Sequence, residues 1–161
     1  MMNTQIDVSI SNQKMQLRID GALVREYCIS TAKNGPGELQ DSECTPRGRH
    51  RIYGKYGQHA PVNSVFVARR WTREICSPAL QEKGEGRDWI LTRIIRLQGC
   101  ETGRNQGGNV DSFRRYIYIH GTPDNTVLGI PGSRGCIRMR NMDIEDLFDR
   151  VPLGAVVNIH S

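Results

Sequence analysis

Apolar and polar residues alternate along the first thirty positions of the chain. The alternation runs over 6–10 and resumes over 15–19 after a polar turn. Because successive side chains of a strand point to opposite faces, this pattern predicts two half-buried strands. Asp20-Gly21 then indicates a two-residue hairpin turn, followed by a third strand over about 23–30. We therefore expect the chain to open as a β-meander.

Strand patterns return later, bounded by turn-forming residues, at 49–53, 64–68, 89–97, 116–120 and 155–159. A Gly- and Pro-rich loop is expected over 33–48, and two long polar connections over 72–88 and 101–113. The first of these connections is expected to hold at most a short helix, over 78–83. Connections of this length are typical of lids or binding loops, although the sequence does not say whether they close over a substrate.

One helix is well indicated near the end of the chain. Its apolar residues follow i, i+3, i+4, i+7 spacing: Ile144, Leu147, Phe148 and Val151. Asn141 is expected to cap it, and Pro152 and Gly154 to end it. No repeat or linker interrupts the chain. We predict a single, mainly β domain over residues 1–161 with a short C-terminal helix.

The chain of 161 residues carries a net charge of +5, which allows attraction to anions. Its basic residues are scattered, and none forms a run of five or more with stacking aromatics, so nucleic acid is not an expected partner. No stretch approaches the ~18 apolar residues of a membrane span, so membrane insertion is not expected either. The net charge of the chain therefore excludes few classes of function.

Five cysteines form an odd set without a CxxC pair or metal-binding spacing to the histidines. We expect reduced thiols, no metal and no cofactor, with Cys28, Cys76 and Cys100 as small core residues. No residue next to Cys44 in the sequence indicates that its thiol is activated as a nucleophile. The first residues lack a secretory pattern, which favours a cytoplasmic protein, or a periplasmic one if a leader was trimmed.

The chemistry is concentrated between 116 and 139. His120 stands at a strand end, and Arg134-Gly135-Cys136 follows, with Arg138 two residues later. A thiol attacks as its thiolate, and a nearby imidazole or cation lowers its pKa, so His120, Arg134 and Arg138 are candidates for activating Cys136. Gly135 lets backbone N–H groups and a carbonyl approach closely, which predicts an oxyanion hole at Gly135-Cys136.

This segment resembles the YkuD family of L,D-transpeptidases. The family signature is His-Gly-Thr, a spacer, and Ser/Thr-x-Gly-Cys-Ile/Val-Arg, which the chain matches with residues 120–122 and 133–138. A second match, STAKNGPG at 30–37 and TPRGRH at 45–50, resembles the family's Ser-Thr-Gly-Lys and Thr-Pro-x-Gly-x-His tract. The resemblance implies a β-sandwich or barrel with mixed sheets.

The resemblance also implies roles for individual residues. Cys136 matches the nucleophile and His120 its base, while the carbonyl of Gly121 would hold the second imidazole nitrogen. Arg138 matches an Arg near the pocket that could clamp a substrate carboxylate, with an ion pair to Asp143 as the structural alternative.

Three further positions of the signature have expected roles. Ser133 and Thr122 are expected to brace the site. Arg134 stands where the family often has His, and Arg cannot serve as a base. Proton transfer would then fall to His120 alone. His50 fits the second tract, where a structural role is expected.

The function implied is acyl transfer on peptidoglycan stem tetrapeptides or muropeptides. The thiolate would attack the carbonyl of the third residue and expel the terminal D-Ala, leaving a thioester. An amine acceptor would make the enzyme an L,D-transpeptidase, and water an L,D-carboxypeptidase of muropeptide recycling, the version that a leaderless chain favours. Carbapenem-type inhibitors are expected to bind. A non-catalytic wall-binding module of the same fold is the alternative.

Overall fold

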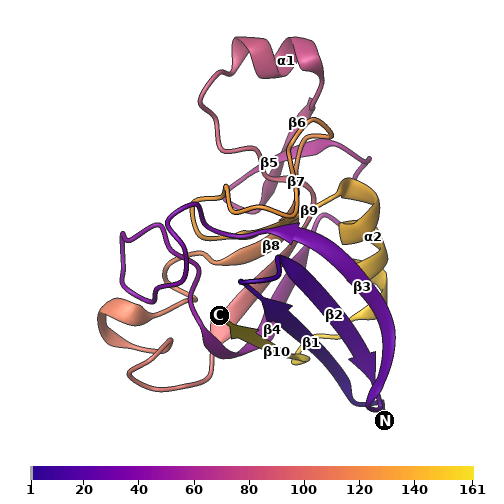
Figure 1. Ribbon diagram of the computed structural model, residues 1–161. Helices are drawn as coiled ribbons and strands as arrows, with labels where there is room; N and C mark the ends of the chain where they lie inside the picture. The colour runs from indigo at the N-terminus through magenta and orange to yellow at the C-terminus, as the bar shows by residue number, and fades with distance from the viewer. Residues whose placement is uncertain (1) are drawn as a thin grey trace.

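The computed structural model describes residues 2–161, and its strands form one curved sheet. In chain order the strands are β1 (Thr4–Ser9), β2 (Lys14–Ile19), β3 (Ala22–Ser30), β4 (Gly48–Tyr56), β5 (Ser64–Val67), β6 (Arg70–Ile75), β7 (Leu91–Gly99), β8 (Tyr118–Gly121), β9 (Ile137–Met139) and β10 (Val156–His160). The helices are α1 (Pro78–Lys83) and α2 (Asn141–Arg150), with a 3₁₀ turn at Gly108–Val110. Figure 1 shows α1 standing away from the body of the molecule.

The sheet closes into a barrel. Its order is β4-β10-β1-β2-β3-β9-β8-β7-β5-β6, and β7 also pairs with β4, so the strands from β4 round to β7 form a ring. The β5–β6 hairpin is attached to this ring by the pairing of β5 with β7. Pairing is mixed, because β1–β10 and β8–β9 are parallel and the remaining pairs antiparallel. The mainly β barrel with mixed pairing and a short C-terminal helix is confirmed.

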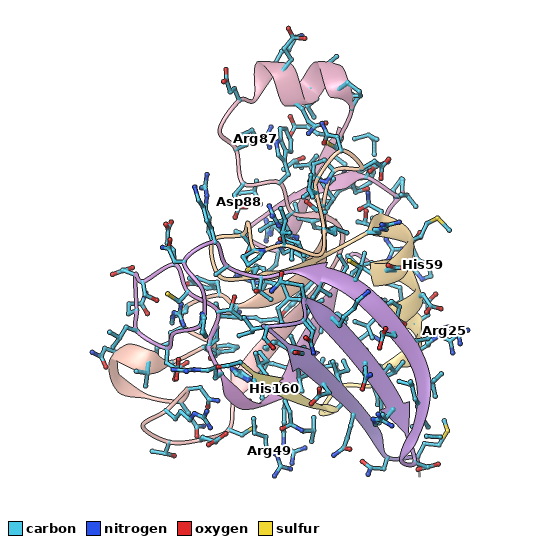
Figure 2. All side chains as sticks on the ribbon, viewed as in Figure 1. Arg25, Arg49, His59, Arg87, Asp88 and His160 are labelled. Carbon is cyan, nitrogen blue, oxygen red and sulfur yellow. The ribbon has the colours of Figure 1, made fainter. Side chains whose placement is uncertain are left out.

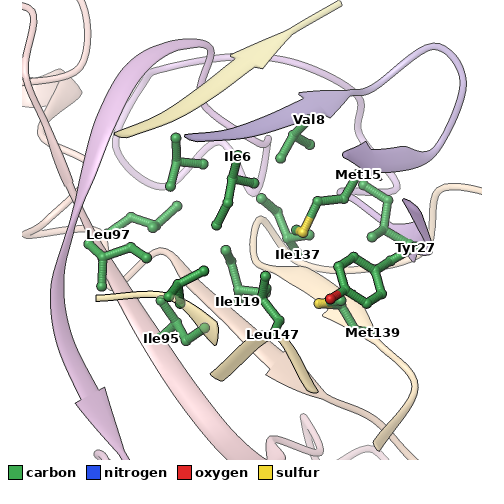
Figure 3. Packing of buried hydrophobic residues seen from close by; sticks show 14 of the residues in the cluster. Ile6, Val8, Met15, Tyr27, Ile95, Leu97, Ile119, Ile137, Met139 and Leu147 are labelled. Atoms are coloured by element: carbon green, nitrogen blue, oxygen red, sulfur yellow. The ribbon is translucent and has the colours of Figure 1, made fainter. Parts of the chain in front are cut away.

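The core fills the barrel with aliphatic side chains from the β-meander, from β7 to β9 and from α2 (Figure 3). Ile6 and Val8 of β1 face inward beside Ile119 of β8 and Ile137 of β9, all fully buried or nearly so. The apolar side of α2 packs into the same core through Leu147. The alternation seen in the sequence thus places one face of each strand inside, as predicted.

The opening meander and the helix α1 follow the sequence expectation. Asp20 and Gly21 both have positive φ, at 51° and 84°, as a type I′ hairpin turn requires. α1 spans Pro78–Lys83, with Ser77 as its N-cap accepting from the Leu80 N–H at 3.1 Å.

Several local expectations are wrong. The strand expected over 116–120 begins only at Tyr118, and β6 extends into the polar connection expected over 72–88. The short β9 was not expected at all. Cys28, Cys76 and Cys100 are partly exposed, not core residues. None of these differences disturbs the ring.

Asn141 is not the cap of α2. Arg140 takes the N-cap position without a side-chain hydrogen bond, and Asn141 is the first helical residue. Its buried amide instead accepts from Thr92 Oγ1 at 2.6 Å and donates to the Thr122 carbonyl at 3.0 Å and to Asn63 Oδ1 at 2.9 Å. Asn141 therefore joins the helix to the segment that follows β8.

The two long connections lie in different places. The loop after β7 packs beside β4, where Asn105 is buried and donates to the carbonyls of Arg47 and Arg49, both at 3.1 Å. The connection after α1 approaches the segment that holds Cys136, as the cavity described below shows. Figure 2 shows Arg87 and Asp88 on that connection as it runs back toward the barrel.

Candidate active site

Two neighbouring parallel strands bring the predicted catalytic residues together. In the register of β8 and β9, Ile119 lies opposite Ile137 and His120 opposite Arg138. The isoleucines face the core, so His120 and Arg138 share the other face of the sheet. Cys136 directly precedes β9 and belongs to that same outer face.

His120 is held in one tautomer. The side chain is 1% exposed, and its Nδ1 lies 2.6 Å from the carbonyl oxygen of Gly121. Because a carbonyl only accepts, the contact assigns the proton to Nδ1 and leaves the Nε2 lone pair free. Burial lowers the pKa of His120, so the ring is neutral at neutral pH and able to take a proton. The carbonyl of Gly121 lies where the resemblance placed it, and its catalytic role stays a prediction.

The Cys136 thiol is neutral in the free protein. Its Sγ accepts from the N–H of Tyr118 at 3.3 Å and donates to the carbonyl of Tyr116 at 3.4 Å. Burial raises the pKa of the thiol to about 12, although part of the residue is still exposed. Neither Arg134 nor Arg138 is among the groups that shift the pKa of Cys136 in this state, and the activation of Cys136 by His120 stays a prediction.

The cation that does lower the pKa of Cys136 is Arg115. Its Nη2 donates to the carbonyl of Cys44 at 2.6 Å and its Nη1 to that of Glu38 at 3.2 Å. Arg115 thus joins the segment before β4 to the segment before β8. The sequence showed only an isolated Arg114-Arg115 pair, and no spacing rule connects it with residues so far away in the chain.

The backbone before Cys136 has a conformation that requires glycine. Gly135 has φ +132°, and a Cβ there would meet the Cys44 carbonyl oxygen at 3.2 Å. The Gly135 carbonyl accepts from Thr45 Oγ1 at 2.9 Å. The family's second tract, which contains Thr45, therefore supports the cysteine segment directly.

Ser133 braces this segment from both sides. Its Oγ donates to the Cys136 carbonyl at 2.5 Å and accepts from the Gly135 N–H at 3.2 Å. The Gly135 N–H is thus already hydrogen-bonded to Ser133. The two free N–H groups expected for the oxyanion hole are therefore not both available. The N–H of Cys136 is the donor left for that role, which stays a prediction.

Thr122 extends the bracing on the side of His120. Its side chain is 3% exposed and its Oγ1 lies 2.9 Å from Oγ1 of Thr126. Its carbonyl accepts from Asn141. The turn after β8 is thereby fixed to the start of α2.

Arg138 has unused hydrogen-bonding capacity. One Nη donates to Ser30 Oγ at 2.9 Å, while its buried Nε has no partner within residues 2–161. The alternative ion pair with Asp143 is not formed. Burial lowers the pKa of Arg138 and the charge of Asp88 acts in the opposite direction. A guanidinium with a free, buried N–H is suited to an anionic ligand.

A cavity of about 200 Å³ opens beside these residues. Thr122, Ser133 and Arg138 line one side, and Asp88 and Trp89 of the connection after α1 line the other. The exposed Arg134 bridges the two sides, because its Nη2 donates to the Gly86 carbonyl at 3.1 Å. Asp88 was not expected from the sequence, since an isolated acid in a polar connection carries no signal.

The other histidines lie elsewhere. His50 is fully buried, with Nε2 2.8 Å from Ser112 Oγ and Nδ1 3.1 Å from the Gly48 carbonyl. His160 pairs with Asp7 at the surface. Within residues 2–161, no three His, Cys, Asp or Glu side chains are grouped as a metal site would need. Nor is any helix in this range long and apolar enough to cross a membrane.

Known proteins with a similar sequence are L,D-transpeptidases by name. The family model YkuD, described as the L,D-transpeptidase catalytic domain, matches residues 3–159. Two proteins of Escherichia coli K12 are similar: "Probable L,D-transpeptidase ErfK/SrfK", 53% identical over 118 residues, and "Probable L,D-transpeptidase YbiS", 49% identical over 116 residues. The alignments cover 66% and 65% of this chain and 34% of each relative. The chain thus spans about a third of the length of these relatives.

The barrel also resembles solved structures. L,D-transpeptidase 3 from Mycobacterium tuberculosis, in complex with a faropenem-derived adduct, superposes with a TM-score of 0.60 at 17% identity, over 99% of this chain and 61% of that one. A mutant of the Enterococcus faecium L,D-transpeptidase gives a TM-score of 0.59 at 16% identity, over 98% and 50%. The fold is therefore the barrel seen in solved L,D-transpeptidases. Since the family model spans nearly the whole chain, the chain belongs to the YkuD family of L,D-transpeptidase catalytic domains.

Proposed function

We propose that this domain transfers an acyl group from a peptidoglycan stem tetrapeptide to an amine, through a thioester on Cys136. The observation that carries the proposal is that His120 of β8 and Cys136, the residue before β9, lie on the same side of these adjacent parallel strands, with Nδ1 of His120 donating to the Gly121 carbonyl. That arrangement leaves Nε2 as the base for the thiol.

The first step starts from a neutral pair. The thiol has a raised pKa and the imidazole a lowered one, so an ion pair is not the resting state. His120 Nε2 removes the proton as Cys136 Sγ bonds to the carbonyl carbon of the third stem residue. The Cys136 N–H faces the developing oxyanion, and Arg138 binds a carboxylate of the stem peptide.

The intermediate then collapses with loss of the last residue. The C–N bond to the terminal D-Ala breaks, and His120 returns its proton to the departing amine. A thioester between Cys136 and the third residue remains. An incoming amine attacks this thioester, gives a proton to His120 and releases the thiol, so that two stems are joined through an amide.

The choice of an amine as acceptor is supported by the names of the relatives, which are transpeptidases. Water at the same thioester would give a tripeptide by the same first step. We therefore expect the two reactions to differ only after D-Ala has left.

Product analysis tests the proposal. The purified domain is incubated with a disaccharide tetrapeptide, alone and with a second stem carrying a free amine, and the products are separated and weighed by mass spectrometry. We expect D-Ala release in both cases and a cross-linked product when the amine is present. Tripeptide as the main product with the amine present would show a carboxypeptidase.

Two controls separate catalysis from binding alone. Cys136→Ala should abolish D-Ala release, whereas replacing Cys100, which is remote from the site, should not. No D-Ala release by the wild type, together with peptidoglycan binding that Cys136→Ala leaves unchanged, would favour the non-catalytic wall-binding module. A carbapenem should add its mass to Cys136, since a solved structure of the similar L,D-transpeptidase LdtMt1 is a complex with the carbapenem imipenem.

A further inference from the structure

The thiol of Cys136 is held by two main-chain groups of a single segment. Its Sγ accepts from the N–H of Tyr118 at 3.3 Å and donates to the carbonyl of Tyr116 at 3.4 Å. Neither bond goes to His120, whose ring is hydrogen-bonded, in the described part of the chain, to the Gly121 carbonyl alone. The S–H group therefore points to a main-chain carbonyl, and not to the imidazole nitrogen that is free to take its proton.

The Tyr116 carbonyl faces the thiol because of an unusual backbone conformation. Tyr116 has φ +56°, in the left-handed region that residues other than glycine seldom adopt. Its N–H closes a tight turn by donating to the Phe113 carbonyl at 3.2 Å. Because Tyr116 is 54% exposed, packing in the core does not account for this conformation. Contacts made by the turn before β8, residues 113–116, have to maintain it.

Arg96 of β7 supplies these contacts. Its Nη2 donates at 2.9 Å to the Phe113 carbonyl, the same oxygen that accepts from the Tyr116 N–H. Its guanidinium carbon lies 3.7 Å from the centre of the Phe113 ring and 5.0 Å from the centre of the Tyr116 ring. One planar cation thus contacts both ends of the turn, through a hydrogen bond and two cation–π interactions.

Stability alone does not explain an arginine at this position. Arg96 is 7% exposed, and among the described residues it forms no ion pair and its buried Nε has no hydrogen-bond partner. A buried charge without a carboxylate partner is unfavourable compared with an apolar side chain of similar size. The guanidinium is better explained by the turn that it orients.

We propose that Arg96 is a positioning residue, which holds the Tyr116 carbonyl against the Cys136 thiol in the free protein. This inference rests on the proposed function, because it concerns the nucleophile of that reaction. The S–H group turns from the Tyr116 carbonyl toward Nε2 of His120 before its proton is transferred and the sulfur attacks. Arg96 acts on the thiol through Tyr116 and not by direct contact.

The S–H stretching vibration of Cys136 tests this placement, because its frequency falls when the thiol donates a hydrogen bond. The infrared spectrum of each protein is compared with that of the same protein carrying Cys136→Ala, so that the bands of the other four cysteines cancel. For the wild type we expect a band below the frequency of a thiol that donates no hydrogen bond. Arg96→Lys keeps the charge but loses the planar group, and it should move the band to higher frequency.

Arg93→Lys is the matched control, because Arg93 lies on the same strand and has the same kinds of partner. Those partners lie outside the turn before β8: the carbonyls of Ala60 and Thr92, at 2.9 and 2.7 Å, and the Phe148 ring, at 5.6 Å. Arg93→Lys should leave the band in place. A band that Arg96→Lys does not move, or that Arg93→Lys moves as far, would overturn the proposal.

Two substitutions at the exposed Tyr116 test the same point without altering a buried residue. Tyr116→Ala and Tyr116→Gly both remove the ring, but only glycine adopts the left-handed backbone without a steric cost. Tyr116→Ala should therefore move the band to higher frequency, and Tyr116→Gly should move it less. A band that stays in place in Tyr116→Ala would overturn the proposal, whether or not Arg96→Lys folds.

The reactivity of the thiol is an independent measure. A hydrogen bond donated by the thiol favours its protonated form, so its loss in Arg96→Lys should raise the rate of Cys136 alkylation by iodoacetamide at pH 8 about threefold. Arg93→Lys should leave this rate unchanged. An unchanged or slower reaction in Arg96→Lys would contradict the positioning role.

Both measurements use the free protein, which separates this inference from the proposed function. If the wild type releases no D-Ala but the band and the alkylation rate respond to Arg96→Lys as described, acyl transfer fails and the positioning role stands. If D-Ala is released while Arg96→Lys and Tyr116→Ala leave the band in place, the positioning role fails and acyl transfer stands.

Discussion

Arg134 donates a hydrogen bond of 3.1 Å to the carbonyl oxygen of Gly86, and this bond joins the cysteine segment to the connection after α1. The position is the one at which the family often has His, and because Arg cannot serve as a base, the sequence left the role of Arg134 open. The structure instead shows a contact between two sides of a cavity, which is a positioning role. Asp88 and Trp89 lie on the segment that this contact holds.

Removal of the Arg134 side chain should therefore affect substrate binding more than chemistry. For Arg134→Ala we expect KM for a tetrapeptide to rise about fivefold, the effect of one hydrogen bond of ~1 kcal/mol, with kcat little changed. Amide hydrogen exchange over 84–89 should become faster. Arg114→Ala, at an exposed arginine away from the cavity, is the control. A loss of kcat at unchanged KM would contradict the positioning role.

Arg115 should govern the reactivity of the thiol. Because its charge lowers the pKa of Cys136, Arg115→Met should move the pH profile of Cys136 alkylation by iodoacetamide to higher pH. At pH 8 the rate should fall severalfold, while the plateau at high pH reports accessibility separately. The neighbouring substitution Arg114→Met should leave the profile in place. An unshifted midpoint in Arg115→Met would show that burial alone sets this pKa.

Asn141 should be important for stability, since its buried amide bonds to groups on three segments. Asn141→Ala leaves the Thr92 hydroxyl and the Thr122 carbonyl without these partners, and we expect a loss of about 2–4 kcal/mol in the free energy of unfolding. Thermal denaturation should show a Tm lower by about 5–15 °C for a domain of this size. Asp143→Ala, in the same first turn of the helix, is the comparison, and an equal change in both variants would refute the bridging role.

His50 should make stability depend on pH. Burial lowers its pKa from 6.5 to about 4, so the unfolded chain binds a proton at a pH where the folded protein does not. The free energy of unfolding should therefore fall as pH drops from about 6.5 to about 4, by about 3 kcal/mol from this group. The buried His120, whose pKa is also lowered, acts in the same direction.

Urea unfolding at pH 7.0 and at pH 4.5 measures this effect. His50→Gln should lose less stability between the two pH values than the wild type does. His160→Gln serves as the control, because His160 lies at the surface and pairs with Asp7, which raises its pKa. If the free energy of unfolding of His50→Gln falls between pH 7.0 and pH 4.5 by as much as that of the wild type, His50 is not the group responsible.

The sequence predicted well the features that depend on local pattern. Alternation located the meander, i, i+3, i+4 spacing located α2, and the Asp20-Gly21 pair located the turn between β2 and β3. The short β9 was not predicted, because three residues are too few to show an alternation of apolar and polar positions. Its existence depends on pairing with β3 and β8, which are distant in the chain.

The site was predicted where residues are adjacent in sequence and missed where they are not. Cys136, His120 and Gly121 belong to recognisable motifs, and the fold brings them together. Arg115 and Asp88 reach the site only through the folding of separate segments. The raised pKa of the Cys136 thiol could not be predicted from the sequence either, because it depends on burial, which the spacing of residues does not show.

The closing pairings of the barrel determine when the chain can finish folding. β10, the final strand, lies between β1 and β4, and it is parallel to β1. A nascent chain still attached to the ribosome near residue 150 therefore has two unpaired edges, at β1 and at β4, whatever has formed upstream. Cys136 and His120 are both synthesised before that gap is filled, so the barrel that carries them closes only once β10 is available, as a late step of folding.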